Sequence, residues 1–517
     1  MITFQTRKDW PPLAWCVSVQ SDTDISVQCG KQVEQHSDWF SEAVWCGDYS
    51  KEGFLKADVL FGTGGGIDQD GSLVIRPSAS SPLDRVFTLE LESCVLASNS
   101  LHCLLAATDL GTPESKEDFR HLQNSLIHGI DECQRHLKVG TETISSTICG
   151  SLRYARGKFI EEEWIEPRPK FSTYLTYISF LETTLRDIFT NSSDPKRERY
   201  CYTPTVGVSS GYDSPFISAV ARNAGLKTCY TFPITYNDLD DDGRDIADRL
   251  GIHCSSFSRY AWQKDVAFAE AYVVAGAGTL AGIELLSAND HLAGKIHLTG
   301  WHGDMVWGLD THADDYGRFK GVETGMSYTE LRLHVGMLNV PVSYLGIGGL
   351  DDIVKISNSP EMKPWDYCHS DGNLDTHGGR YSRPICRRLL EESGVPRDSF
   401  AQQKKAIMTT SADLCHSSQS LNSMYKSAKA RGLREPTRCR QILWALAEWL
   451  LHPMRTLGTT NFKGASRLKM LEAPLRNKLR KEQQSFHDWI PWANDFIYNI
   501  YRRETPSSRS PKPPSRP

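Results

Sequence analysis

Residues 206–215 read Val206-Gly207-Val208-Ser209-Ser210-Gly211-Tyr212-Asp213-Ser214-Pro215. The apolar run ending at Val208 is typical of a buried strand, and Pro215 fits the first turn of a helix, where its missing N–H has no cost. The small residues between them let backbone amides approach a ligand, and a helix N-terminus favours an anion. The stretch therefore predicts a phosphate-binding turn; an ordinary strand–turn–helix corner is the alternative. It is not a P-loop, because no lysine follows the turn.

Composition limits the class of protein. A chain of 517 residues predicts two domains with extensions. Its 39% hydrophobic and 23% charged residues are typical of a soluble globular protein, and a net charge of −5 argues against general affinity for nucleic acid or membranes. No run of 18 apolar residues predicts a membrane span. Fourteen scattered cysteines without a CxxC or HExxH pattern indicate a cytoplasmic protein with free thiols and no structural metal.

The turn carries a family resemblance. Ser-Ser-Gly-Tyr-Asp-Ser at 209–214 resembles the SGGxDS pyrophosphate loop of the ATP pyrophosphatases, the PP-loop superfamily, with Ser210 in place of one glycine. Members split ATP into AMP and pyrophosphate and leave a substrate adenylated. The resemblance implies that Asp213 holds Mg²⁺, and that the ATP phosphates lie against Val208, Ser209, Ser210, Gly211, Tyr212, Asp213 and Ser214.

A second segment follows about 90 residues later. Ile-His-Leu-Thr-Gly-Trp-His-Gly-Asp-Met-Val-Trp-Gly at 296–308 resembles the (S/T)GxGxDE…G segment at which asparagine and β-lactam synthetases bind Mg²⁺–pyrophosphate. Gly300, Gly303 and Asp304 match this pattern. Both segments follow apolar strands, and ligands of parallel α/β sheets bind at the strands' carboxyl ends. We therefore expect Asp213 and Asp304 to face one magnesium ion.

The second segment also departs from the family. Met305 replaces an acidic residue, and His302 replaces a glycine. Trp301 stands where β-lactam synthetases carry a catalytic tyrosine, and an indole cannot relay a proton as a phenol can. The resemblance places Trp301 and His302 at the catalytic centre, and the departures predict different proton chemistry.

Two further stretches complete the expected site. Counted from Pro396, Lys404 falls on the family's active-site lysine, with Lys405 beside it, and a cation there would neutralise charge as pyrophosphate leaves. Two exposed lysines in a polar loop are the alternative. The backbone of the strand around Thr231 and Phe232 is expected to contact adenine, as in the superfamily. The aspartates that follow it are read either as a solvated loop or as functional acids: Asp238, Asp240, Asp241 and Asp242.

The first part of the chain is expected to be rich in strands. Phe87, Leu89 and Leu91 alternate with polar residues in a strand over 85–92, which residues 73–75 and 94–98 would pair. The sequence predicts a turn at 63–66 and helices over 115–137 and 172–189. Residues 1 to about 110 resemble the glutamine-hydrolysing domain of asparagine synthetases. The catalytic cysteine of that domain follows the initiator methionine, and here Ile2 takes its place.

Glutaminase activity is therefore predicted to be absent, and Cys16, Cys29 and Cys46 cannot replace a nucleophile that is also an N-terminal amine. The expected fold class is α/β: a degenerate glutaminase-like (Ntn-type) α+β sandwich over 1–165 precedes a doubly wound parallel-sheet PP-loop synthetase domain over 166–460. A helical extension (461–504) and a disordered tail (505–517) would follow.

These resemblances imply an ATP- and Mg²⁺-dependent carbon–nitrogen ligase of asparagine-synthetase type. It would adenylate a small-molecule or peptide carboxylate and transfer it to ammonia or an amine. The rival hypotheses are a PP-loop enzyme that modifies a nucleobase or sugar, and a nucleotide-binding regulatory protein without turnover. Neither a nucleic acid nor a membrane partner is expected, and a homodimer is left open.

Overall fold

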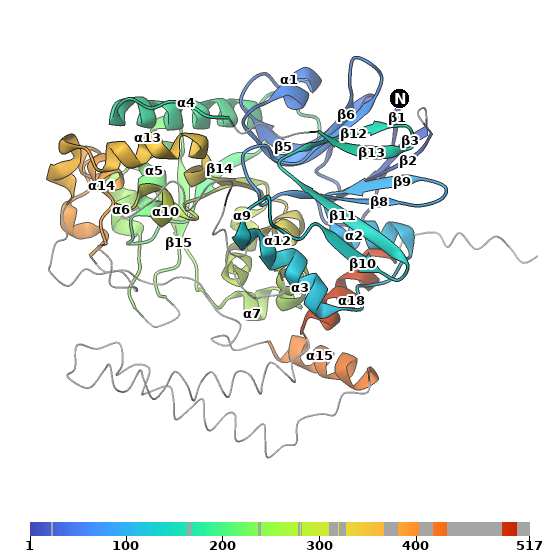
Figure 1. The fold of residues 1–517 in the computed structure, drawn as a ribbon. Helices are drawn as coiled ribbons and strands as arrows, with labels where there is room; N and C mark the ends of the chain where they lie inside the picture. Colours follow the sequence, from blue (N-terminus) through green and yellow to red (C-terminus); the bar gives the residue numbers. More distant parts are fainter. Residues whose placement is uncertain are drawn as a thin grey trace, which may run out of the picture.

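The structure is a computed structural model that describes residues 1–21, 24–162, 167–235, 239–277, 280, 282–309, 319, 327–366, 381–402, 417–431 and 489–503. It is mixed α/β with several sheets (Figure 1). None of the helices in these ranges is both long and apolar enough to span a membrane.

The N-terminal part, residues 1–162, contains two sheets. The larger has the strand order β1 (Ile2–Thr6), β3 (Asp24–Cys29), β2 (Trp15–Ser21), β9 (Val95–Ser98), β8 (Arg85–Glu90), β11 (Glu142–Ile148), β10 (His136–Val139). The smaller has the order β13 (Lys158–Glu162), β12 (Ser151–Ala155), β7 (Leu73–Arg76), β6 (Leu60–Ile67), β5 (Trp39–Trp45), β4 (Glu34–Gln35).

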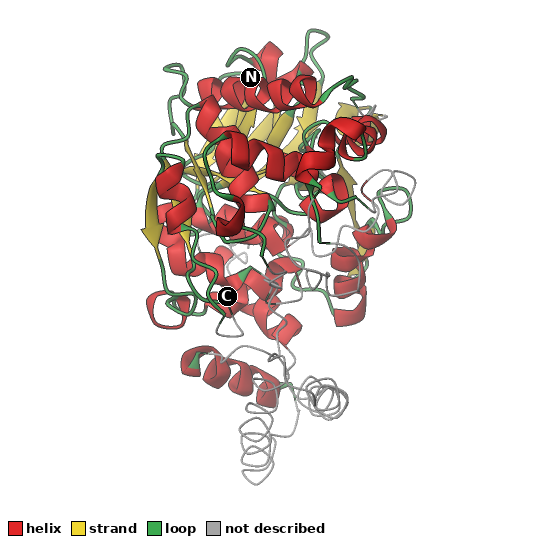
Figure 2. Cartoon of the chain, turned by 90° about the vertical axis from the view of Figure 1, so that its left-hand side faces the viewer, coloured by secondary structure: helices red, strands yellow, loops and turns green. Residues whose placement is uncertain are grey.

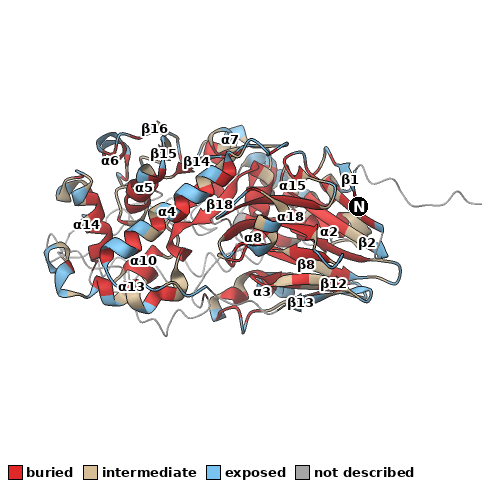
Figure 3. Cartoon of the chain, turned by 90° about the horizontal axis from the view of Figure 1, so that it is seen from above, coloured by how far each residue is buried: buried red, intermediate tan, exposed pale blue. Residues whose placement is uncertain are grey.

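The apolar faces of these two sheets form a shared core, because alternate side chains of a strand point to the same face. Trp15 of β2 meets Phe40 of β5 edge-to-face at 5.0 Å. Val17, Val27 and Ile75 are fully or almost fully buried in the same cluster. Figure 3 shows buried residues along β8, whereas β13 at the edge of the smaller sheet is largely exposed. The helices of this part are α1 (Lys51–Lys56), α2 (Leu101–Thr108), α3 (Lys116–Asn124) and the 3₁₀ turn η1 (Ser125–His128).

Three local expectations are wrong here. Residues 73–75 form β7, which pairs with β6 and β12 and not with β8. Residues 63–66 lie inside β6, where an added Cβ at Gly64 would come within 2.4 Å of the Phe40 carbonyl oxygen, so that strands pack too closely for a side chain. The helix expected over 115–137 ends near 128, and Leu137 lies in β10.

The C-terminal part is built on parallel strands. β14 (Thr203–Val206), β17 (Lys295–Thr299) and β18 (Leu338–Pro341) form one sheet, and β15 (Thr228–Thr231) pairs with β16 (His253–Ser256). A parallel bridge from Gly207 to Tyr230 joins the two groups. The order is thus β16-β15-β14-β17-β18, and the chain reverses direction across the sheet between β14 and β17. Ligands of open parallel α/β sheets bind at such a point.

Helices lie on either side of the strands in Figure 2. α4 (Tyr174–Ser192) contacts α5 (Asp213–Ala224), which follows β14 and ends at Gly225 with φ 117°. Leu175 of α4 is 65% exposed. The other described helices and 3₁₀ turns are α6 (Arg244–Arg249), α7 (Trp262–Asp265), α8 (Ala269–Ala277), η2 (Ile283–Ala288), α9 (Asn289–Leu292), α10 (Gly303–Trp307), α12 (Ser327–Val335), η4 (Val342–Tyr344), η5 (Ile347–Gly349), α13 (Leu350–Ser357), η6 (Pro360–Trp365), α14 (Pro384–Glu392), η7 (Arg397–Ser399), α15 (Ser418–Ala430) and α18 (Trp489–Tyr501).

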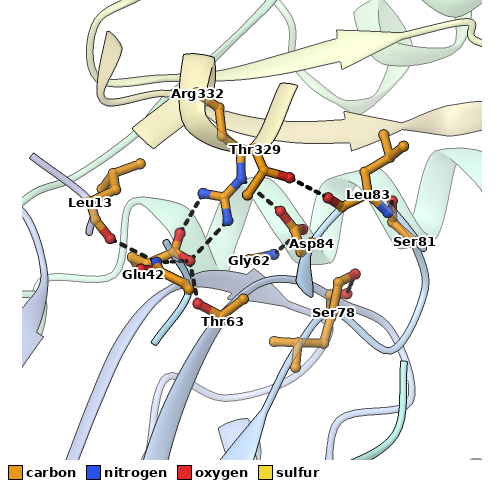
Figure 4. A network of polar contacts seen from close by, with 12 residues as sticks. Leu13, Glu42, Gly62, Thr63, Ser78, Ser81, Leu83, Asp84, Thr329 and Arg332 are labelled. Atoms are coloured by element: carbon orange, nitrogen blue, oxygen red, sulfur yellow. Dashed lines mark hydrogen bonds and ion pairs between the residues drawn. The ribbon is translucent and has the colours of Figure 1, made fainter. Parts of the chain in front are cut away.

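A buried ion network joins the two parts (Figure 4). Arg332 of α12 donates to both carboxylate oxygens of Glu42 on β5, at 2.7 and 3.0 Å, and to Asp84 beside β8 at 2.6 Å. Thr329, one helical turn earlier, donates to the carbonyl of Leu83 at 2.6 Å. The network fixes α12 against the N-terminal strands.

Candidate functional site

The turn between β14 and α5 is held by its own side chains. The Ser214 hydroxyl accepts from the amide of Ser209 at 3.0 Å, and the Ser209 hydroxyl accepts from the amide of Gly211 at 3.3 Å. No side chain caps α5, whose first residue is Asp213. The turn is half-buried, so its small polar groups remain within reach of a ligand at the start of a helix.

The second predicted segment lies directly against this turn. A Cβ added at Gly300 would lie 2.7 Å from the Cβ of Asp213, and one added at Gly303 would lie 2.6 Å from its Oδ1. At contacts this short, a side chain at either position would force Asp213 or its neighbours to move. The two segments, distant in sequence, therefore meet at the carboxyl ends of adjacent strands, as the sequence predicted.

An arginine that the sequence did not single out lies between the two predicted metal ligands. Nη1 of Arg383 donates to Oδ1 of Asp213, and Nη2 lies 4.0 Å from Oδ2 of Asp304. The side chain of Arg383 is only 5% exposed, and burial lowers its pKa to about 10, so the guanidinium stays charged at neutral pH. Two carboxylates thus share one cationic group.

Two aromatic rings pack against this arginine. The guanidinium lies 5.7 Å from the ring centroids of both Tyr212 and Tyr381, which meet edge-to-face at 5.0 Å. The hydroxyl of Tyr212 accepts a hydrogen bond from the buried Arg387. Tyr212, predicted to bind ATP, therefore has its side chain in the interior, and only its backbone borders the turn.

The acidic stretch after β15 also reaches the turn. Asp241 is 2% exposed, and its Oδ1 accepts from the amide of Ser210 at 3.1 Å and from its hydroxyl at 2.7 Å. An added Cβ at Gly243 would lie 2.6 Å from the backbone of Val208, which places this stretch on the turn. Asp241 therefore does not belong to a solvated loop.

Thr231, which is expected to contact adenine, already takes part in hydrogen bonds. The carbonyl of Thr231 accepts from the amide of Phe257 at 3.0 Å, and its hydroxyl accepts from the amide of Gly243 at 3.1 Å. The ring of Phe232 lies under the guanidinium of Arg259 at 5.1 Å. Both residues lie at the carboxyl end of β15, beside the turn, but Thr231 is 1% exposed.

His302 and Trp301 form the bend between β17 and α10. His302 has a φ of 55°, a left-handed conformation that suits the glycine of the family, and its Nδ1 shares a 2.6 Å hydrogen bond with the Tyr344 hydroxyl. Burial lowers the pKa of His302 to about 4, against the opposing effect of Asp304. The imidazole is therefore neutral at pH 7. The carbonyl of Trp301 accepts from Ser343.

Tyr344 connects the bend to a pocket of about 470 Å³ between the two parts of the chain. This volume suits a small molecule. The lining is largely apolar and includes a carboxylate and a guanidinium; it is formed by Asp58, Val59, Ala79, Ser80, Pro167, Arg168, Pro169, Phe180, Phe319, Tyr344, Leu345, Gly346, Ile347 and Gly348.

Some expectations fall outside the described residues. Lys404, Lys405 and Asp238 lie there, as do the tail over 505–517 and most of the extension over 461–504. Among the described residues, no group of three or more His, Cys, Asp or Glu side chains could hold a metal ion.

In the N-terminal part, Ile2 lies in the edge strand β1 with its side chain buried in the sandwich core. Burial raises the pKa of Cys29 to about 12 and that of Cys46 to about 12, and it raises the pKa of Cys16 as well. These thiols are protonated at neutral pH, and a protonated thiol is a poor nucleophile.

Comparison with known proteins adds no relative: no protein-family model matches the chain, and no curated protein matches it.

Proposed function

We propose that the chain is an ATP-dependent, AMP- and pyrophosphate-forming ligase that adenylates a carboxylate and transfers the acyl group to ammonia or an amine. The observation that carries this proposal is the meeting of Asp213 with Gly300 and Gly303 where the strand order reverses. Two loops typical of PP-loop synthetases, one suited to phosphate and one to a metal–phosphate pair, adjoin there. The finer fold assignments, an Ntn-type sandwich followed by a PP-loop domain, belong to the same proposal.

The residues present fit Mg²⁺ with ATP. Mg²⁺ prefers one or two carboxylates with phosphate oxygens, and Asp213 and Asp304 both lie beside one cationic group, Arg383. When bound, the ion would neutralise phosphate charge. Ser209, Gly211 and the uncapped start of α5 would bind phosphate oxygens, and Arg383 is close enough to these groups to bind another.

The pocket beside Tyr344 is the proposed site of the carboxylate substrate. Its apolar walls would exclude water from an acyl-adenylate, and Arg168 would attract the acid. The attacking nitrogen must lose a proton during amide formation. His302 is neutral at pH 7 and can accept one, whereas the indole of Trp301 cannot. Lys404 keeps its proposed role beside the leaving pyrophosphate.

Free ammonia, an amine or the substrate's own nitrogen would serve as nucleophile. The buried Ile2 and the protonated thiols of Cys16, Cys29 and Cys46 favour a structural N-terminal part over a glutaminase. Incubation with glutamine should release no glutamate above background, and release that one cysteine substitution abolishes would contradict this assignment.

A second function is favoured by one contact. The ion pair of Arg383 with Asp213 fills the predicted metal position with a protein cation. A nucleotide-binding regulatory protein without turnover could keep this pair permanently.

The test is to incubate the full-length protein with ATP, MgCl₂, ammonium and pools of carboxylic acids, and to measure AMP and pyrophosphate. We expect equal amounts of both with at least one pool, and release that is slower by about 10²–10³-fold from Asp213→Asn. Release of ADP and phosphate alone would contradict the ligase. ATP binding without product from any pool would favour the regulatory protein.

A further inference from the structure

Both halves of the proposed nucleotide site are occupied by charges of the chain itself. Arg383 stands beside the carboxylates that would bind the metal, and Asp241 stands on the amide and hydroxyl of Ser210 that would bind a phosphate. We propose that Arg383 and Asp241 are internal placeholder ligands, which the divalent cation and the phosphate groups displace when they bind. This inference takes its ligands from the function proposed above.

Arg383 has the features of a displaceable cation. Its carboxylate partners are 28% and 52% exposed, so an arriving ion can reach both without unfolding the site. The guanidinium lies over the rings of Tyr212 and Tyr381, which leave it a surface along which to turn. Its fork of donors suits a phosphate as well as a carboxylate. The guanidinium would therefore move from Asp213 to a phosphate of the incoming nucleotide.

Asp241 has the features of a displaceable anion. A carboxylate oxygen accepting from a turn amide and a hydroxyl mimics the phosphate oxygen that such a turn binds. The side chain is buried, so its negative charge would repel a phosphate brought to the same donors. Phosphate binding therefore requires Asp241 to leave Ser210.

Tyr381 lies near both placeholders. Its ring contacts the guanidinium of Arg383, and its hydroxyl lies 3.9 Å from the position of a Cβ on Gly211, within the turn. Movement of either placeholder would therefore disturb its surroundings. Displacement of Asp241 by phosphate and displacement of Arg383 by the cation are expected to favour each other. Once phosphate has replaced Asp241, the guanidinium that leaves Asp213 can bind that phosphate.

The cation half is tested by titrating the nucleotide-free, full-length protein with Mn²⁺ and following bound ion by electron paramagnetic resonance. Arg383→Gln removes the competing charge and should bind Mn²⁺ about tenfold more tightly than the wild type. Adding Asp213→Asn to Arg383→Gln should abolish the gain. Arg383→Lys keeps a positive charge on a shorter side chain, and its Mn²⁺ affinity should lie between those of the wild type and Arg383→Gln.

The matched control is Arg388→Gln in α14, the helix that Arg383 directly precedes, because Arg388 pairs with Glu361 and Glu392 at 2.5 and 2.8 Å, away from the turn. It should leave Mn²⁺ affinity unchanged. Equal Mn²⁺ affinity in wild type, Arg383→Gln and Arg383→Lys would overturn the role of Arg383.

The anion half is tested with inorganic pyrophosphate in EDTA, by calorimetry. Asp241→Asn keeps an oxygen acceptor for Ser210 without the charge, and it should bind pyrophosphate about tenfold more tightly. Asp242→Asn, whose carboxylate pairs with Arg244 at the surface, should match the wild type. Arg383→Gln should bind pyrophosphate more weakly. Unchanged or weaker binding by Asp241→Asn would overturn the role of Asp241.

These measurements need no turnover. If the placeholder variants gain affinity but no pool yields AMP and pyrophosphate, the inference stands and the ligase does not. If the wild type releases AMP and pyrophosphate while the affinities stay unchanged, the ligase stands and the inference is wrong.

Discussion

Among the described residues, the arginine–carboxylate trio at the junction and the one at the candidate site lie in different surroundings. At the junction, Arg332, Glu42 and Asp84 have side chains that are 1%, 0% and 3% exposed. At the candidate site, Arg383 is 5% exposed, but its partners are 28% and 52% exposed. The same charges are sealed in one place and open to solvent in the other.

The difference separates a structural use of charge from a functional one. Burial alone would lower the pKa of Arg332, but the carboxylates of Asp84 and Glu42 raise it above its ordinary value. That trio is closed further by hydrogen bonds to Glu42 from Thr63 and Asn99 at 2.5 and 3.1 Å. Around Arg383, water can replace a partner, so ligands can exchange.

The largest expected effect comes from breaking the sealed trio. Arg332→Met leaves two buried carboxylates without a counter-charge and should lower the free energy of unfolding by about 3–5 kcal/mol. Urea unfolding followed by circular dichroism measures the loss. Arg383→Met is the matched control and should cost far less, because the carboxylates of Asp213 and Asp304 can be hydrated. Equal losses would remove the distinction between the trios.

The next effect is on catalysis, and here the carboxylates of the candidate site should matter more than those of the sealed trio. Asp213→Asn and Asp304→Asn should each reduce Mg²⁺-dependent pyrophosphate release by about 10²–10³-fold while leaving the urea midpoint nearly unchanged. Asp84→Asn, the same substitution in the sealed trio, should mainly destabilise the protein. Wild-type rates in both site variants would show that these carboxylates hold no metal.

The α/β class is confirmed, and much of the parallel part was predictable from local signals. Pro215, Gly225 and the apolar runs set α5 and its neighbouring strands, because helix ends and strand cores leave marks in adjacent residues. Which sheet a strand joins depends on distant partners. Residues 73–75 were therefore placed beside the wrong strand, and the glycines of β6 were interpreted as a turn.

In the candidate site, too, the features marked by local sequence were predictable, and those that depend on distant contacts were not. The meeting of Asp213 with Gly300 and Gly303 followed from two motifs and the geometry of parallel sheets. Arg383 was missed, because its role depends on a contact with Asp213, which lies 170 positions earlier in the chain. Asp241 left a signal, an acidic run after a strand, but nothing local distinguishes it from Asp240 or Asp242.

Acidification should weaken the protein through its buried histidines. Burial lowers the pKa of His297 from 6.5 to about 3, so below pH 6.5 the unfolded chain binds a proton that the folded chain does not. Stability should therefore fall as the pH drops from 6.5, by up to about 1.4 kcal/mol per pH unit for this group. The half-buried His302 should add less. Neither group contributes above pH 6.5.

Urea midpoints at pH 7.5 and 5.5 measure this loss. His297→Gln should lose less stability between these pH values than the wild type. The hydrogen bond of His297 to the hydroxyl of Tyr230, 2.9 Å long, lies inside the sheet, so the effect is one of stability and not of site chemistry. An identical pH dependence in both proteins would contradict the assignment.

The smallest expected effect tests how far the site depends on the bend at His302. Tyr344→Phe removes one hydrogen bond to Nδ1 and should cost about 1 kcal/mol of stability. The bend leads into α10, which contains Asp304, and Ser343 also holds the bend by donating to the carbonyl of Trp301. Pyrophosphate release should therefore fall only a few-fold. Stability comes from urea unfolding and turnover from the pyrophosphate assay.

Tyr498→Phe is the matched control. The hydroxyl of Tyr498, which lies in α18, donates to Asp109 at 3.0 Å, away from the turn. It should cost a similar free energy and leave turnover unchanged. If both variants lose stability but neither loses turnover, the bend holds its shape without Tyr344, and the pocket is not coupled to the carboxylates through His302. A loss of turnover confined to Tyr344→Phe would show that the carboxylates at the candidate site depend on this contact.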